Sequence, residues 1–143
     1  MNIRDSSLLN ETDVIQIDDQ GYISQYFCLY HSDDGYYQIV NLNSGLYINV
    51  FGASGDDGAR IIQYQFEDAD NEKWVMEANG DGSWRITPKM ARQLGLGPAD
   101  NSDESGTNIV QKNFDGNDHS KWFFSIAGDP RGATRLGGAD AWQ

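Results

Sequence analysis

Short bursts of apolar residues, separated by turn-forming residues, recur along this chain. In the segment 34–80 the bursts are YYQIV, LYINV, RIIQYQF and KWVME, with Gly, Asn, Asp and Ser between them. Each burst has the length of a strand, is rich in β-branched or aromatic residues, and partly alternates apolar with polar positions. No stretch keeps a helical period of apolar positions. The pattern therefore predicts an all-β fold made of short strands.

The four-burst phrase is repeated along the chain. Asp34 and Asp81 open two copies 47 positions apart, and Trp74 and Trp122 close them 48 positions apart. The beginning of the chain matches the later part of an earlier copy, in which Phe27 stands where the others have tryptophan. Because one four-stranded unit cannot bury its own apolar face, three copies predict a closed β-trefoil with pseudo-threefold symmetry. The three aromatic residues are expected to occupy equivalent core positions.

The alignment of the copies also sets the expected domain limits, with one trefoil over residues 1–126 and a C-terminal tail over 127–143. The repeats span about 1–33, 34–80 and 81–126. The first repeat is truncated at its N-terminus and lacks an opening strand, which would leave an open sheet edge and an uncovered patch of core. Residues 134–136 of the tail are a candidate replacement strand, in cis or from a neighbouring chain. Dimerisation or local disorder at the gap are the alternatives.

The segment SGLYINVFGASGDDGARIIQYQFEDADNEKW (44–74) resembles the ricin B-chain-type, or QxW, β-trefoil lectin family. In that family the phrase runs as SG-x-x-L-D-V, a glycine loop, V-x-x-W and then N-Q-x-W. The resemblance covers about residues 1–126 and implies a β-trefoil that binds carbohydrate. Only the first repeat keeps the glutamine of the QxW motif, as Gln25, whereas Glu72 and Ser120 replace it in the other two.

The resemblance further implies a shallow sugar pocket in each lobe. Such a pocket uses an acidic residue after the second strand, an aromatic residue ten positions before the final tryptophan, and nearby amides. In the middle repeat Asn49 stands at the acidic position and Tyr64 at the aromatic one, while Glu67, Asn71 and Glu72 are expected to line the rim. An aromatic ring takes the apolar face of a pyranose, and amide or carboxylate oxygens bind its hydroxyls.

The other two repeats keep less of this site. The first repeat has Asn2, but Ile17 replaces the aromatic residue; the third has Gly97 and Lys112 and has lost both elements. We therefore expect the middle repeat to hold the one usable pocket. The alternative for Tyr64 is an ordinary half-buried strand residue with no ligand.

Charge and the remaining motifs exclude several other classes of function. With 22 acidic and 10 basic residues, the net charge is -12, which repels nucleic acid and anionic membranes. The single cysteine, Cys28, excludes an internal disulfide and is expected to lie in the core. His31 and His119 do not space like zinc ligands, and DADNE (68–72) lacks the glycine and distal glutamate of a calcium loop. Neither a phosphate-binding loop nor a nucleophile elbow is present, so no cofactor and no enzymatic activity are expected.

The leading hypothesis is therefore a carbohydrate-binding, lectin-like module for a galactose-type or other glycan, either free-standing or part of a multidomain protein. The alternative is a degenerate trefoil that serves as a structural or protein-interaction module, as the losses in the third repeat suggest. Homo-oligomers are a further candidate assembly. An extracellular location follows from the family resemblance, although no signal peptide is visible at the N-terminus.

Overall fold

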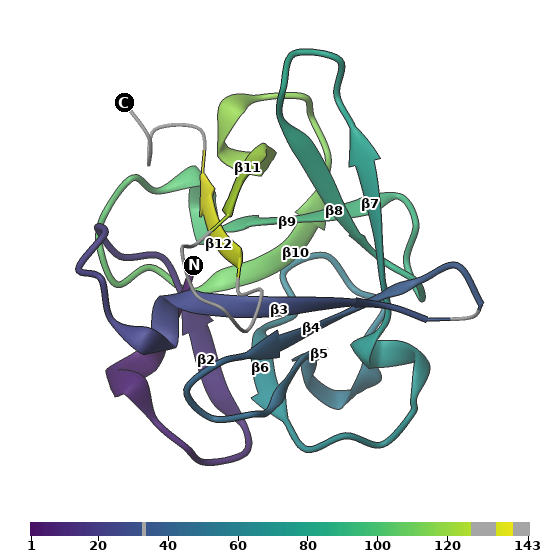
Figure 1. The fold of residues 1–143 in the computed structure, drawn as a ribbon. Helices are drawn as coiled ribbons and strands as arrows, with labels where there is room; N and C mark the ends of the chain where they lie inside the picture. The colour runs from purple at the N-terminus through teal and green to yellow at the C-terminus, as the bar shows by residue number, and fades with distance from the viewer. Residues whose placement is uncertain (33, 127–133, 139–143) are drawn as a thin grey trace.

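A computed structural model of the chain describes residues 1–32, 34–126 and 134–138, which form an all-β fold with no α-helix among them (Figure 1). The strands are β1 (Asn2–Ile3), β2 (Thr12–Ile15), β3 (Tyr26–His31), β4 (Tyr37–Asn41), β5 (Tyr47–Val50), β6 (Ile61–Tyr64), β7 (Trp74–Ala78), β8 (Trp84–Pro88), β9 (Leu94–Pro98), β10 (Ile109–Asn113), β11 (Trp122–Ile126) and β12 (Thr134–Gly138). Short 3₁₀ turns connect them at η1 (Arg4–Ser6), η2 (Ile23–Gln25), η3 (Phe51–Ala53), η4 (Asp70–Glu72), η5 (Ala99–Asn101) and η6 (Asp118–Ser120).

Three antiparallel hairpins, β3–β4, β7–β8 and β11–β12, carry the threefold pattern and surround the centre of the molecule in Figure 1. Neighbouring hairpins meet at the starts of their strands, through one residue pair at two of the junctions and through two pairs at the junction of β12 with β3. The equivalent pairs are Tyr37 with Trp74, Trp84 with Trp122, and Thr134 with Phe27, and the last junction adds Arg135 with Tyr26. This repetition of one contact confirms the predicted β-trefoil.

β12 takes the place of the strand that the first repeat lacks. It pairs along its whole length with β11, and Thr134 and Arg135 pair with Phe27 and Tyr26 of β3. In this structure β12 covers one edge each of β3 and β11. Since unpaired edges invite association with other strands, this pairing also removes two such edges.

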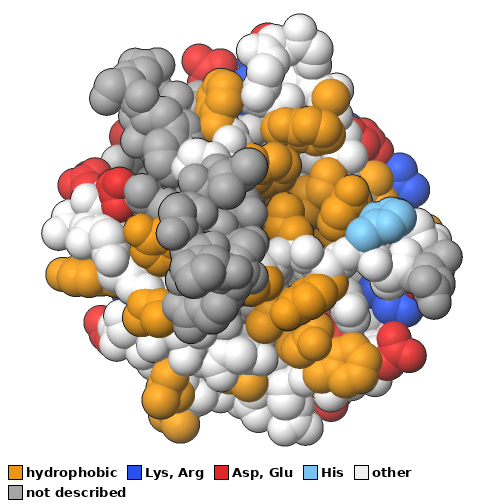
Figure 2. All heavy atoms as spheres, in the orientation of Figure 1, with side chains coloured by type: hydrophobic (Ala, Val, Ile, Leu, Met, Phe, Trp, Pro, Cys, Tyr) orange, Lys and Arg blue, Asp and Glu red, His pale blue; other side chains and the backbone are white. Residues whose placement is uncertain are grey.

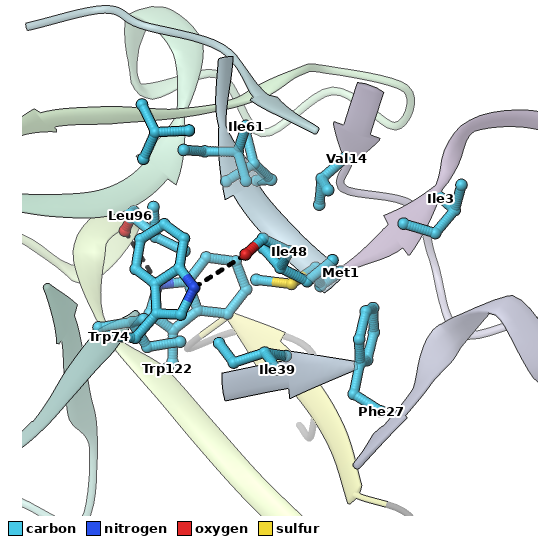
Figure 3. Close-up of a cluster of buried hydrophobic side chains, with 13 residues drawn as sticks. Met1, Ile3, Val14, Phe27, Ile39, Ile48, Ile61, Trp74, Leu96 and Trp122 are labelled. Atoms are coloured by element: carbon cyan, nitrogen blue, oxygen red, sulfur yellow. Dashed lines mark hydrogen bonds between the residues drawn. The ribbon is translucent and has the colours of Figure 1, made fainter. Parts of the chain in front are cut away.

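The core lies where the three repeats meet, and the three predicted aromatic residues are in it (Figure 3). Phe27 and Trp74 are fully buried and Trp122 is nearly so. The two indole Nε1 atoms donate equivalent hydrogen bonds, from Trp74 to the Ile48 carbonyl at 3.0 Å and from Trp122 to the Leu96 carbonyl at 2.9 Å. A buried indole N–H needs such an acceptor, so both rings are oriented as well as buried.

Three glutamines, one in each repeat, connect the repeats to one another. Each side-chain Nε2 donates to two backbone carbonyls of a loop in a different repeat. The bonds run from Gln16 to Ser102 and Glu104, from Gln63 to Ser7 and Leu9, and from Gln111 to Ser54 and Asp56. Because each donor reaches across more than 50 residues of chain, the ring of contacts ties the three repeats into one domain.

The Asp that opens each repeated phrase forms an ion pair within its repeat. Asp34 pairs with Lys73 at 3.1 Å and Asp81 with Lys121 at 2.9 Å. A hydrogen bond from a neighbouring serine hydroxyl and the lysine together hold the pKa of each carboxyl well below its usual range. Each pair ties the opening turn of a repeat to its closing strand.

The expectation for Cys28 was wrong. Its strand places Phe27 and Leu29 toward the core, so the Cys28 side chain lies on the opposite face and is only half-buried. Its thiol is free. No helix among the described residues is long and apolar enough to cross a lipid bilayer.

Candidate functional site

Strands β5 and β6 place Asn49 and Tyr64 on one face. The two strands are antiparallel, with Tyr47 opposite Tyr64 and Asn49 opposite Ile62. Ile48 and Gln63, which alternate with these residues, are fully buried toward the core. Because successive side chains of a strand point to opposite faces, Asn49 and Tyr64 lie together on the outer face. They stand diagonally across the strand pair.

Asn71, from the 3₁₀ turn η4, joins Asn49 in an amide pair. Its Nδ2 donates to Asn49 Oδ1 at 2.7 Å and to the Val50 carbonyl at 3.2 Å. Asn49 is 3% exposed, whereas Asn71 is half-buried. Within the part of the chain that the structure describes, Asn49 Nδ2 and Asn71 Oδ1 have no hydrogen-bond partner, and neither atom is fully buried. The pair therefore keeps one donor and one acceptor for a ligand.

The two glutamates expected at the rim are in different environments. Glu67 is exposed, as a rim residue must be. Glu72 is fully buried, and its carboxylate accepts the backbone N–H of Ala69 at 3.1 Å and of Glu67 at 3.3 Å. Burial contradicts a rim role for Glu72, because a ligand hydroxyl cannot reach this carboxylate. Its function is to hold the loop between β6 and η4.

Burial is also the main reason that the pKa of Glu72 is raised above its ordinary value of 4.5. Backbone N–H groups of Glu67, Ala69 and Asp68 act in the opposite direction without overcoming it. Gln25, the counterpart of Glu72 in the first repeat, holds the equivalent loop through hydrogen bonds without carrying a charge. Its Oε1 accepts from the N–H groups of Gln20 and Tyr22, and its Nε2 donates to the Asp18 carbonyl at 3.1 Å.

Glu72→Gln is therefore expected to stabilise the protein at neutral pH by about 1 kcal/mol, through one added hydrogen bond and the loss of a buried charge. A raised pKa in the folded state means that the wild type loses stability as the pH rises above 4.5. The gain from Glu72→Gln should then be larger near pH 7 than near pH 4.5, as measured by urea unfolding at both values. Gln25→Glu is the matched control, and it should cost stability mainly at neutral pH. An equal gain from Glu72→Gln at both pH values would contradict the assignment.

The equivalent positions of the other two lobes differ from those of the middle lobe. In the third lobe the Lys112 side chain lies against Gly97, where an added Cβ would be 3.0 Å from Lys112 Cδ. The Lys112 ammonium group is bound to Asn101 Oδ1 and to the Pro98 carbonyl. In the first lobe Asn2 Oδ1 accepts a hydrogen bond from Ser24, as Asn49 Oδ1 accepts one from Asn71, but Ile17 stands where the middle lobe has Tyr64.

Two aromatic residues beside Tyr64 were missed at the level of sequence. Tyr47 lies directly opposite Tyr64 in the strand pair, and Phe66 follows Tyr64 by two positions. The Tyr47 and Phe66 rings have their centroids 5.1 Å apart. The alternation Tyr64, Phe66 is visible in the sequence, but the role of Tyr47 depends on strand register. Among the described residues, no three His, Cys, Asp or Glu side chains come together as a metal site.

The comparison with protein families decides the relationship of this chain to known proteins. The model of the ricin-type β-trefoil lectin domain-like family matches residues 24–111. The chain belongs to this family. The predicted resemblance is thus confirmed, and the chain has a carbohydrate-binding type of fold. No curated protein matches the chain.

Several solved structures share this ricin-type fold. The designed threefold-symmetric protein ThreeFoil is 28% identical, with 95% of this chain and 88% of that chain covered and a TM-score of 0.81. An exo-β-1,3-galactanase from Clostridium thermocellum is 30% identical over 85% of this chain, with a TM-score of 0.81, but only 26% of its own chain is covered. The ricin B-like lectin of Macrolepiota procera, in complex with lactose, is 17% identical, with 78% and 77% covered and a TM-score of 0.67. Ricin-type lectin domains are generally not enzymes, and the match to the galactanase extends over about a quarter of that protein.

Proposed function

We propose that this protein is a lectin-like module that binds a galactose-type or related glycan through its middle repeat. The observation that carries the proposal is the Asn49–Asn71 amide pair, which lies on the same outer face as Tyr64. Support also comes from neighbours in the family and fold: one ricin B-like lectin is in complex with lactose, and the Polyporus squamosus lectin is bound to a sialylated galactose epitope.

The chemistry of the three residues suits a pyranose. The Tyr64 ring takes the apolar C–H face of the sugar. Asn49 Nδ2 donates to one hydroxyl and Asn71 Oδ1 accepts from its neighbour, while the exposed Glu67 carboxylate supplies a charge-assisted acceptor at the rim. Since Asn49 stands where the family has an acidic residue, Glu67 compensates for the missing charge.

The affinity of one such site should be near millimolar, or about -4 kcal/mol, because a shallow pocket with few contacts leaves little surplus after the cost of association. Useful avidity would then require a second module in the same protein or an oligomer. We expect no further site from the third lobe, where Lys112 lies against Gly97, or from the first lobe, which has Ile17 in place of the aromatic residue.

Tyr64→Ala should abolish detectable sugar binding, since it removes stacking worth about 1–2 kcal/mol from a weak site. Tyr64 is half-buried on the outer face, so the variant should still fold. Lys112→Ala, at the equivalent position of the third lobe, is the matched control and should leave sugar binding unchanged. The measurement is an NMR titration with galactose, lactose, mannose and xylan-derived sugars.

Chemical shift changes grouped around Asn49, Tyr64 and Asn71 would support the proposal. Changes grouped around Lys112, or none with any of these sugars, would contradict it. In that case the second candidate, a structural or protein-interaction module, becomes the better one, because two of the three lobes have already lost their sugar-binding residues.

A further inference from the structure

An aromatic surface extends from the candidate site on the outer face of the middle repeat. Tyr30 and Phe66 are each 54% exposed, and Tyr47, on β5, is half-buried. The rings of Tyr47 and Phe66 are tilted by 46° with centroids 5.1 Å apart. In Figure 2, hydrophobic side chains gather over the region where Figure 1 shows β3, β4 and β5. We call Tyr30, Tyr47 and Phe66 the aromatic extension.

The aromatic extension continues the candidate site in one direction along the strands. On the outer face of β5 and β6, Asn49 lies opposite Ile62 and Tyr47 lies opposite Tyr64. Phe66 lies two residues beyond Tyr64, in the direction away from Asn49. The amide pair is therefore on one side of Tyr64, Tyr47 lies beside Tyr64, and Phe66 lies on the other side. A spacing of two residues along a strand is about 7 Å, which is close to the length of one sugar unit.

The third repeat shows what happens to the same positions where there is no site. Phe114 is the counterpart of Phe66, and the Arg85 guanidinium covers its ring at 4.4 Å. Gly95 replaces Tyr47 there, and the Arg85 side chain lies against it. In the described residues of the middle repeat no Lys or Arg lies over Phe66 or Tyr47. Phe66, which is 54% exposed, is thus accessible to a ligand.

We propose that the aromatic extension is a second sugar subsite, which binds the next unit of an oligosaccharide whose first unit stacks on Tyr64. This inference rests on the proposed function. Phe66 and Tyr30 offer apolar faces, and the Tyr47 hydroxyl, whose pKa is raised mainly by burial, stays protonated and can donate to a sugar oxygen. The ligand class is therefore an oligosaccharide of at least two units rather than a monosaccharide.

The test compares each monosaccharide with its longer counterpart, using galactose against lactose and xylose against xylotriose, by NMR titration of the full chain. One of these two pairs is expected to bind the wild type. Within that pair, the longer sugar should bind on the order of tenfold more tightly than the monosaccharide. Phe66→Ala should reduce this ratio to about twofold or less and leave the monosaccharide Kd unchanged. Phe114→Ala is the matched control and should keep the wild-type ratio.

Phe66→Leu provides a second variant, since it keeps an apolar side chain without a ring. It should also reduce the ratio of the monosaccharide Kd to the oligosaccharide Kd to about twofold or less. Equal weakening of monosaccharide and oligosaccharide by Phe66→Ala, or an unchanged ratio, would overturn the second subsite while leaving the Tyr64 site in place. If none of the four sugars binds the wild type, the proposed function fails and the subsite fails with it. Tyr64→Ala separates the two ideas, because it should remove binding of both sugar lengths.

Discussion

Trp74→Ala is expected to lower the free energy of unfolding by roughly 3–5 kcal/mol, which approaches the whole stability of an ordinary domain. Trp74 is fully buried at the junction of the repeats, and its Nε1 donates to the Ile48 carbonyl at 3.0 Å. Truncation would leave a large cavity and an unpaired buried carbonyl. Urea unfolding followed by tryptophan fluorescence or circular dichroism measures the loss.

Trp74→Phe is the control for this prediction. Phe27 occupies the equivalent core position in the first repeat and is also fully buried, so a phenyl ring fits the threefold arrangement. The variant should lose only about 1–2 kcal/mol, for the smaller ring and the missing hydrogen bond. Comparable losses for the two variants, or a loss below 1 kcal/mol for Trp74→Ala, would show that the tryptophan is not a core residue.

Deletion of residues 128–143 is expected to destabilise the domain by about 5 kcal/mol, because it removes the ladder hydrogen bonds of β12. That strand pairs with β11 from Thr134 to Gly138 and with β3 through Thr134 and Arg135. Its loss would expose one edge each of β3 and β11, so the shortened chain should also tend to associate. Thermal unfolding and light scattering measure the two effects.

A chain that ends at Gly138 is the matched control, since it keeps β12. It should retain the melting temperature and the oligomeric state of the full chain. If deletion of 128–143 changes neither quantity, β12 does not contribute to the domain in solution.

The sequence by itself determined the repeat, the fold class and the core aromatics. A period of 47 to 48 residues is a property of the chain, and four short apolar bursts per period are too short and too β-branched for helices. Because no repeat can bury its apolar face alone, the period already implies a closed threefold assembly with Phe27, Trp74 and Trp122 inside. The candidate sugar-binding residues Asn49 and Tyr64 were predicted from the family resemblance, since both lie within one continuous motif of the sequence.

Burial could not be assigned in the same way for every polar residue. Glu72 and Glu67 look alike in sequence, yet one is fully buried beneath a loop and the other is exposed. The difference arises because the Glu72 carboxylate accepts backbone N–H groups of its own loop, which only the folded geometry brings within reach. Cys28 was misplaced for a related reason, since an uninterrupted apolar run does not show which of its residues face the core.

Only the tertiary structure decided what lies beside what across the repeats. Strand register placed Tyr47 opposite Tyr64 and so joined Phe66 to the site, although 17 residues separate the two tyrosines in the chain. The three glutamines that reach into other repeats, and the position of β12 between β11 and β3, depend on closure of the ring. Such contacts join residues far apart in sequence, so a local pattern carries no information about them. They form because closure of the ring brings β12 beside two strand edges and brings each of these glutamines within hydrogen-bonding distance of loop carbonyls that need a donor.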